Sequence, residues 1–156
     1  MRVSTRAASG KLLYVVHVIR YERPVRFEDV DAAQIVFFAR FFSYCHEAME
    51  SLFAPLDGGY VRLIIGRKIG LPAVHVEADF KTPLCYGDVA RIDVTVPHVG
   101  TTSCTLVYDI YRASDGARAA TIRHVCVVTD LGTLTKIPIP EDMRAVLTAH
   151  AQAANR

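Results

Sequence analysis

Apolar and polar residues alternate along several stretches of the chain, which is the pattern of strands that bury one face. The alternation predicts strands at about 13–28, 73–80, 91–96, 106–111 and 117–129. Pro24 interrupts the first of these, which indicates an edge strand or a bulge. Short turns join the later strands, and Ser114-Asp115-Gly116 is a strong hairpin signal. Because short turns join antiparallel neighbours, we expect an antiparallel sheet of about five strands.

One stretch has helical spacing instead, and it predicts a long helix over residues 37–56. Its apolar stripe covers nearly three sides, so we expect the sheet to wrap around this helix and bury it. Shorter helices are predicted at about 60–68 and 140–151. The order of elements therefore predicts an α+β fold in which one long apolar helix lies against an antiparallel sheet.

The composition fits one globular domain, because 51% of the 156 residues are hydrophobic and 22% are charged. We place this domain at residues 12–152 and read residues 1–11 as a loose N-terminal tail. The net charge of +2 argues against nucleic-acid binding. The apolar run 12–19 is shorter than the ~20 residues that span a bilayer, so we expect no membrane association and a cytoplasmic protein.

The four cysteines are Cys45, Cys85, Cys104 and Cys126, and they form no C-x-x-C pair. None lies near a histidine in metal-ligand spacing. We therefore expect four buried, reduced thiols and no metal site.

Asp31 lies where the first predicted strand gives way to the long helix. It could be an ordinary helix N-cap, a position that aspartate favours. It could instead share a cleft with the free N–H groups of the helix start, which would equip the site to attack an acyl group and stabilise an oxyanion. A cap alone does not require a second carboxylate at Asp29 or the bulky apolar residues that follow.

Several motifs between residues 19 and 130 resemble those of the hotdog-fold acyl-CoA thioesterases in the 4-hydroxybenzoyl-CoA thioesterase family. The segment His46-Glu47-Ala48 resembles the helix of that family's 1,4-dihydroxy-2-naphthoyl-CoA hydrolases. The other matching motifs are Val25-Arg26-Phe27-x-Asp29-x-Asp31-x-x-x-Ile35-Val36-Phe37-Phe38, Ala78-Asp79-Phe80-x-x-Pro83, Gly87-Asp88 and Gly100-x-x-Ser103.

The resemblance implies a hotdog fold and hydrolysis of an aryl-CoA or medium-sized acyl-CoA thioester. Asp31 would be the nucleophile or the general base, and the backbone N–H of Phe38 would polarise the thioester carbonyl. Coenzyme A would be part of the substrate, and no cofactor is expected. The family also implies dimers with sheets joined edge to edge, further assembly into a homotetramer, and active sites between subunits.

The resemblance makes Gln34, Val36, Phe37 and His46 substrate-binding candidates. Gln34 replaces the family's usual glycine, and it either orients the water or carbonyl or points outward. His46 either reads a hydroxyl on the substrate ring or is a surface or interface histidine. Asp29 is expected to be structural.

Two alternative functions remain. The chain could hydrolyse thioesters held by a carrier protein, or it could be a non-catalytic acyl-binding subunit. Thr101-Thr102 replaces the basic hairpin that binds nucleotide phosphates in some family members. Phosphate contacts would then come from Arg67, Lys68 or Lys81.

Overall fold

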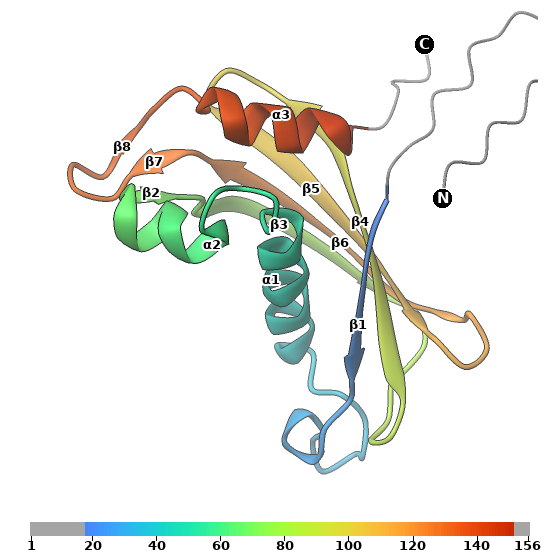
Figure 1. The fold of residues 1–156 in the computed structure, drawn as a ribbon. Helices are drawn as coiled ribbons and strands as arrows, with labels where there is room; N and C mark the ends of the chain where they lie inside the picture. Colours follow the sequence, from blue (N-terminus) through green and yellow to red (C-terminus); the bar gives the residue numbers. More distant parts are fainter. Residues whose placement is uncertain (1–17, 152–156) are drawn as a thin grey trace, which may run out of the picture.

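The protein is described by a computed structural model that covers residues 18–151. Its main feature is a five-stranded sheet with the strand order β1-β4-β5-β6-β3 (Figure 1). Each neighbouring pair is antiparallel, as predicted, but β3 pairs with β6 and not with β4, which follows it in the sequence. The strands are β1 (Ile19–Pro24), β3 (Ala73–Phe80), β4 (Val89–Val99), β5 (Ser103–Arg112) and β6 (Arg118–Val127).

The remaining elements are helical segments and one small three-stranded sheet, β2-β7-β8. The predicted helix at 60–68 is a short α-helix followed by a π-helix, and the last predicted strand is divided between β6 and β7. Among residues 18–151, no helix combines the length and apolarity that crossing a membrane requires. The bounds are η1 (Phe27–Asp29), α1 (Arg40–Leu52), α2 (Gly59–Val61), η2 (Arg62–Gly66), β2 (Ile69–Gly70), β7 (Thr129–Asp130), β8 (Thr135–Lys136) and α3 (Glu141–Ala149).

Helix α1 lies across one face of the sheet and packs mainly against β1 and β4 (Figure 1). Its buried residues, which include Tyr44 and Leu52, meet the alternating apolar residues of the central strands in one core. Helix α3 packs against β4 and adds Met143 and Leu147 to that core. The predicted α+β class is therefore confirmed.

Helix α1 is shorter than predicted and less buried. The apolar spacing continues through Val36 and Phe37, but their N–H groups donate to the carbonyls of Leu84 (2.8 Å) and Asp29 (2.9 Å). These bonds hold residues 36–37 outside the helix, so it begins at Arg40. The sheet buries the apolar side of α1, as expected, but the remaining side, which includes Ser43, His46 and Glu50, is exposed to solvent.

The first predicted strand also differs from the structure. β1 ends at Pro24, and residues 27–29 form a 3-10 helix where the alternation predicted more strand. Residues 13–17 and the predicted tail at 1–11 lie outside the described residues.

The cysteine prediction is confirmed for three residues and wrong for one. Cys45, Cys104 and Cys126 are buried free thiols, whereas Cys85 is a free thiol exposed on the loop after β3. Burial raises the pKa of Cys104 to about 12 and that of Cys126 to about 11.

Candidate active site

Asp31 lies at the base of a tight turn in the loop between β1 and α1. Its N–H donates to the carbonyl of Ile35 (3.0 Å), and the N–H of Gln34 donates back to the Asp31 carbonyl (2.9 Å). The Asp31 carboxylate accepts the N–H of Ala33 at 2.8 Å. The N-cap interpretation is therefore wrong: the cap residue of α1 is Ala39, and no side chain caps the helix.

Gln34 occupies the turn position that needs a left-handed backbone. Its φ is +64°, a conformation that glycine adopts freely and other residues adopt at a cost. A glycine at this position would be free of strain, whereas Gln34 bears the strain that the turn imposes.

The start of α1 leaves two backbone donors unused beside this turn. The N–H of Phe37 donates to Asp29, and the N–H of Arg40 donates to the Phe37 carbonyl (2.8 Å). Within residues 18–151, the N–H groups of Phe38 and Ala39 have no acceptor. These free donors also lie at the positive end of the helix dipole, where developing negative charge is stabilised.

Asp31 and Phe38 line the same cleft, which has a volume of about 470 Å³. Phe41 and Phe80 close part of its wall with an edge-to-face contact (5.2 Å between ring centroids). The charged residues on the lining are Asp31 and Lys81. The full lining is Asp31, Ile35, Val36, Phe37, Phe38, Phe41, Phe80, Lys81, Thr82, Pro83, Leu84 and Ala119. Two of the substrate-binding candidates, Val36 and Phe37, thus share a cleft with both catalytic candidates.

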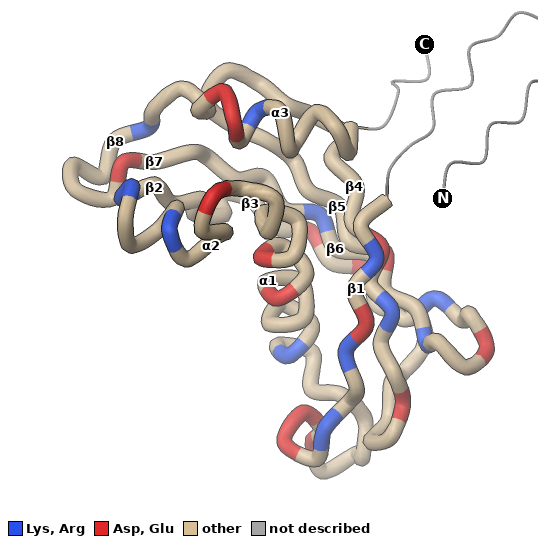
Figure 2. The backbone as a smooth tube through the Cα atoms, viewed as in Figure 1, with Lys and Arg blue, Asp and Glu red and all other residues tan. Residues whose placement is uncertain are grey.

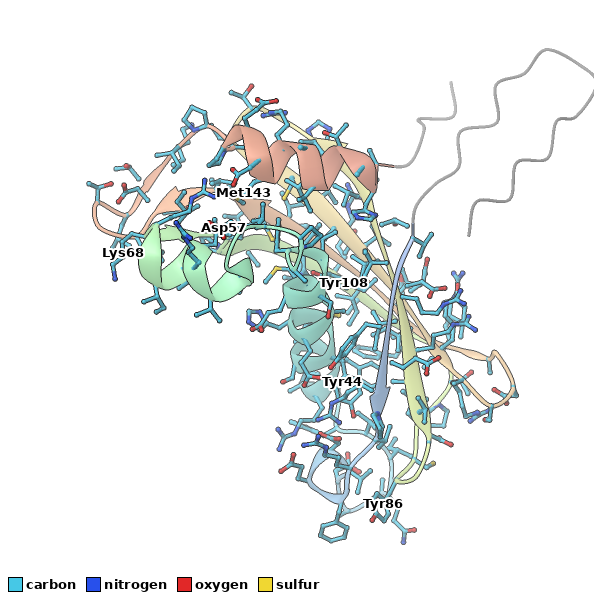
Figure 3. The ribbon with its side chains drawn as sticks, in the orientation of Figure 1. Tyr44, Asp57, Lys68, Tyr86, Tyr108 and Met143 are labelled. Atoms are coloured by element: carbon cyan, nitrogen blue, oxygen red, sulfur yellow. The ribbon has the colours of Figure 1, made fainter. Side chains whose placement is uncertain are left out.

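Gln34 lies on a different cleft. That second cleft, of about 630 Å³, is also lined by Phe27, Cys85 and Tyr86. Tyr86 marks its place at the lower tip of the molecule in Figure 3. Ile35 lines both clefts, so the turn separates them. The role of Gln34 in substrate binding stays a prediction.

His46 is not on either cleft; it lies on the exposed side of α1 with 55% of its side chain accessible. Its Nε2 atom is 3.1 Å from a carboxylate oxygen of Glu50, and its ring meets the edge of Tyr60 (5.8 Å between centroids). Its role as a reader of the substrate ring stays a prediction.

A buried polar cluster joins the catalytic loop to β1 and α1, and its central residue, Arg23, was not predicted. Arg23 is 8% exposed and forms an ion pair with Asp29, which is 1% exposed. Its Nε atom donates to Glu47 of α1 at 3.4 Å. The available signal was the position of Arg23 on the core-facing side of the alternation, between Tyr21 and Val25.

Asp29 is structural, as predicted, because its carboxylate accepts the N–H of Arg26 at 2.7 Å. Burial by itself would raise the pKa of Asp29, but the Arg26 N–H and the Arg23 guanidinium outweigh it and lower the pKa. Glu47 also accepts a hydrogen bond from the Tyr21 hydroxyl (2.9 Å). Both carboxylates thus tie structural elements together and are not part of the cleft lining.

Seven of the eleven arginines among residues 18–151 already have carboxylate partners, which makes them weaker candidates for phosphate binding. Arg67, one of the phosphate candidates, makes two hydrogen bonds to Asp142, at 2.6 and 3.1 Å. Lys and Arg residues are interspersed with Asp and Glu along β1 and its neighbours (Figure 2). Lys81 is the phosphate candidate that lies on the cleft.

Comparisons with known proteins agree on one family. Residues 25–147 match the family model described as the thioesterase-like superfamily. A 1,4-dihydroxy-2-naphthoyl-CoA hydrolase from Microcystis aeruginosa is 35% identical over 124 residues, which cover 80% of this chain and 88% of that protein.

Solved structures give the same result. A 1,4-dihydroxy-2-naphthoyl-CoA thioesterase from Synechocystis superposes with a TM-score of 0.76 at 28% identity, covering 85% of this chain and 96% of that one. A gentisyl-coenzyme A thioesterase superposes with a TM-score of 0.72 at 27% identity, covering 82% and 98%. The hotdog fold expected from the sequence motifs is confirmed by these similarities.

Proposed function

The chain belongs to the thioesterase-like superfamily and is a thioester hydrolase, and from that premise we propose that it hydrolyses an aryl-CoA. The observation that carries the proposal is the shared cleft, in which the Asp31 carboxylate and the free N–H of Phe38 line one largely apolar space. A thioester carbonyl held there would have a base or nucleophile on one side and an oxyanion donor on the other.

Asp31 acts in one of two ways. As a general base it takes a proton from water, and the water oxygen attacks the thioester carbon; as a nucleophile its oxygen attacks directly and forms a mixed anhydride that water then hydrolyses. In both routes negative charge develops on the carbonyl oxygen, where the N–H of Phe38 stabilises it by about 3 kcal/mol. The C–S bond then breaks, and the coenzyme A thiolate takes up a proton.

The acyl group is proposed to be aromatic. The cleft walls include the rings of Phe37, Phe38, Phe41 and Phe80, which suit a flat apolar group. The relatives named as naphthoyl-CoA and gentisyl-CoA thioesterases support the same class. In this proposal Val36 and Phe37 contact the acyl group, and His46 and Gln34 contact the substrate from outside this cleft.

The active protein is proposed to be a homo-oligomer built on β3. This strand is at the edge of the sheet, and all of its residues are exposed, including Val74 (61%), Val76 (41%) and Phe80 (45%). A long exposed apolar edge favours pairing with another strand. Pairing with β3 of a second copy would cover these residues and place the cleft, which Phe80 at the end of β3 helps to line, at the subunit boundary. A tetramer would be a pair of such dimers.

The test is thiol release from a panel of aryl-CoA and aliphatic acyl-CoA esters by wild type and Asp31→Asn. The asparagine keeps an oxygen for the Ala33 N–H but loses the charge, so we expect kcat to fall by about 10³-fold. Equal rates in the two proteins would remove Asp31 from the mechanism. Single turnover in labelled water separates the two roles, because only the anhydride route places label in the Asp31 carboxylate.

Two alternatives are tested in the same experiment. A higher kcat/KM for the same acyl group on a carrier protein would favour a carrier-protein thioesterase. Binding of an aryl-CoA in calorimetry without hydrolysis of any ester would favour an acyl-binding subunit. The cytoplasmic location and the absence of a cofactor stay predictions.

A further inference from the structure

The buried polar cluster around Arg23 contacts both parts of the candidate active site. Arg23 belongs to β1, and it pairs with Asp29 in the catalytic loop and with Glu47 in α1. Its guanidinium also donates to the Pro24 carbonyl (2.9 Å) and stacks on Tyr44, 4.4 Å from the ring centroid. Tyr44 extends from α1 toward β1 in Figure 3. One side chain thus joins three elements.

Stability alone is a weak reason for such a cluster. Removing a buried ion pair from water is costly, and apolar residues of similar volume often replace one without loss of stability. In addition, the hydroxyl of Tyr44 is buried beside the Asp29 carboxylate, so the cluster removes a further polar group from water. The cluster is better explained by the relative positions of the catalytic loop and α1, which it holds fixed.

That geometry includes both catalytic candidates. Asp29 precedes Asp31 by two residues, and its carbonyl accepts the N–H of Phe37, the residue before Phe38. Arg23 fixes the side chain of Asp29. The Arg23 guanidinium therefore determines the position of the Asp31 turn relative to the start of α1. Glu47 holds the same guanidinium from the helix side.

We propose that Arg23 is a positioning residue for thioester hydrolysis: through Asp29 and Glu47 it holds the Asp31 carboxylate and the Phe38 N–H at a working separation. This inference rests on the proposed function. Arg23 itself does not line the cleft, so it acts on the reaction through the loop and not by touching substrate. Misplacement by about 1 Å can cost a reaction about 100-fold in rate, so a loosened loop should lower kcat even in a folded protein.

The main test variant is Arg23→Met with Asp29→Asn, which removes both charges and keeps an oxygen for the Arg26 N–H. We expect kcat on an aryl-CoA to fall by about tenfold to 100-fold, with KM changed by less than about threefold. The matched control is Arg20→Met with Asp93→Asn, because this pair joins β1 to β4 at 2.9 Å but is exposed. The control should keep the wild-type kcat.

A second variant, Arg23→Lys, guards against a failure to fold. Lysine keeps the charge opposite Asp29, but one ammonium cannot reproduce the planar fork that contacts Asp29, Pro24 and Glu47 together. We expect a folded protein, checked by circular dichroism, with kcat lowered by about tenfold.

Coupling to Asp31 separates positioning from a general structural effect. In an Asp31→Asn background only the Phe38 N–H remains to be positioned, so Arg23→Lys should lower the residual kcat by clearly less than the roughly tenfold expected with Asp31 present. A folded Arg23→Lys protein with wild-type kcat would overturn the inference, as would an equal loss with and without Asp31. If wild type hydrolyses no aryl-CoA, the proposed function fails instead.

Discussion

The strained turn at Gln34 gives a prediction that tests both the stability of the loop and the role of this side chain. The perturbation is Gln34→Gly. Gln34 has a φ of +64°, and a left-handed backbone costs a residue with a side chain about 1–2 kcal/mol. Glycine removes that cost but loses about 0.5–1 kcal/mol through the greater freedom of its unfolded chain. Because the Gln34 side chain is exposed, little packing is lost.

The net expectation is a gain of about 0.5–1 kcal/mol in the free energy of unfolding, which corresponds to a melting temperature about 2 °C higher. Thermal unfolding followed by circular dichroism, at one fixed protein concentration, measures this shift. The control is Ala33→Gly at the neighbouring position, which is outside the left-handed region and should lose about 0.5–1 kcal/mol.

A melting temperature for Gln34→Gly at or below that of wild type would refute the reasoning about strain. The same variant tests the chemistry. Gln34 does not line the cleft of Asp31, so we expect kcat within about twofold of wild type, and any effect on binding should be in KM. A large fall in kcat would instead place the amide beside the reacting carbonyl.

Three further predictions concern substrate binding, acid stability and assembly. Lys81→Gln should raise KM for an aryl-CoA by about tenfold, because one charge-assisted contact to a phosphate is lost. KM for the pantetheine thioester, which has no phosphate, should stay unchanged. An equal rise in KM for both esters would contradict a phosphate contact at Lys81. The pKa of Asp29 is lower in the folded state than in the unfolded state. The stability that its charge gives the folded protein is therefore complete above the unfolded pKa of about 3.9, and it is lost as the pH falls through the folded-state pKa. The advantage of wild type over Asp29→Asn in urea unfolding should therefore be full at pH 6 and shrink below about pH 4; a constant difference would show that the charge is not responsible. Val76→Asp should dissociate the oligomer in analytical ultracentrifugation, because it places a carboxylate on the exposed β3 edge. The control, Val61→Asp at an exposed valine of α2, should leave the oligomer intact. An unchanged sedimentation coefficient for Val76→Asp would argue against pairing through β3.

The strands could be predicted because their signal is local, but the place of β3 beside β6 could not, because that pairing joins segments far apart in the sequence. Along residues 89–94 of β4 and 106–111 of β5 buried residues alternate with more exposed ones, and short turns fix the antiparallel pairing of β4, β5 and β6. The start of α1 could not be predicted in the same way. Val36 and Phe37 have the right apolar spacing for a helix, but their N–H groups bond to Leu84 and Asp29, which the spacing does not reveal.

The part of the candidate site that is formed by residues close together in the sequence could be predicted. Asp31 and Phe38 are seven residues apart, and they come together through one turn and one helix start. Arg23 was missed because a lone arginine in a strand looks like a solvated residue until its partners, Asp29 and Glu47, are placed around it. The strain at Gln34 was missed because a residue type does not reveal its backbone angle.

The distribution of the thiols makes the natural protein suitable for site-selective labelling. Cys45, Cys104 and Cys126 are buried, and burial raises the pKa of each thiol, so little reactive thiolate is present at neutral pH. Cys85 is exposed on the loop after β3. Its backbone forms a β-bridge with Ile35, a residue that lines both clefts. A fluorine or fluorescent reporter attached to Cys85, without any mutation, would report on the second cleft directly, and on the cleft of Asp31 through the neighbouring Ile35.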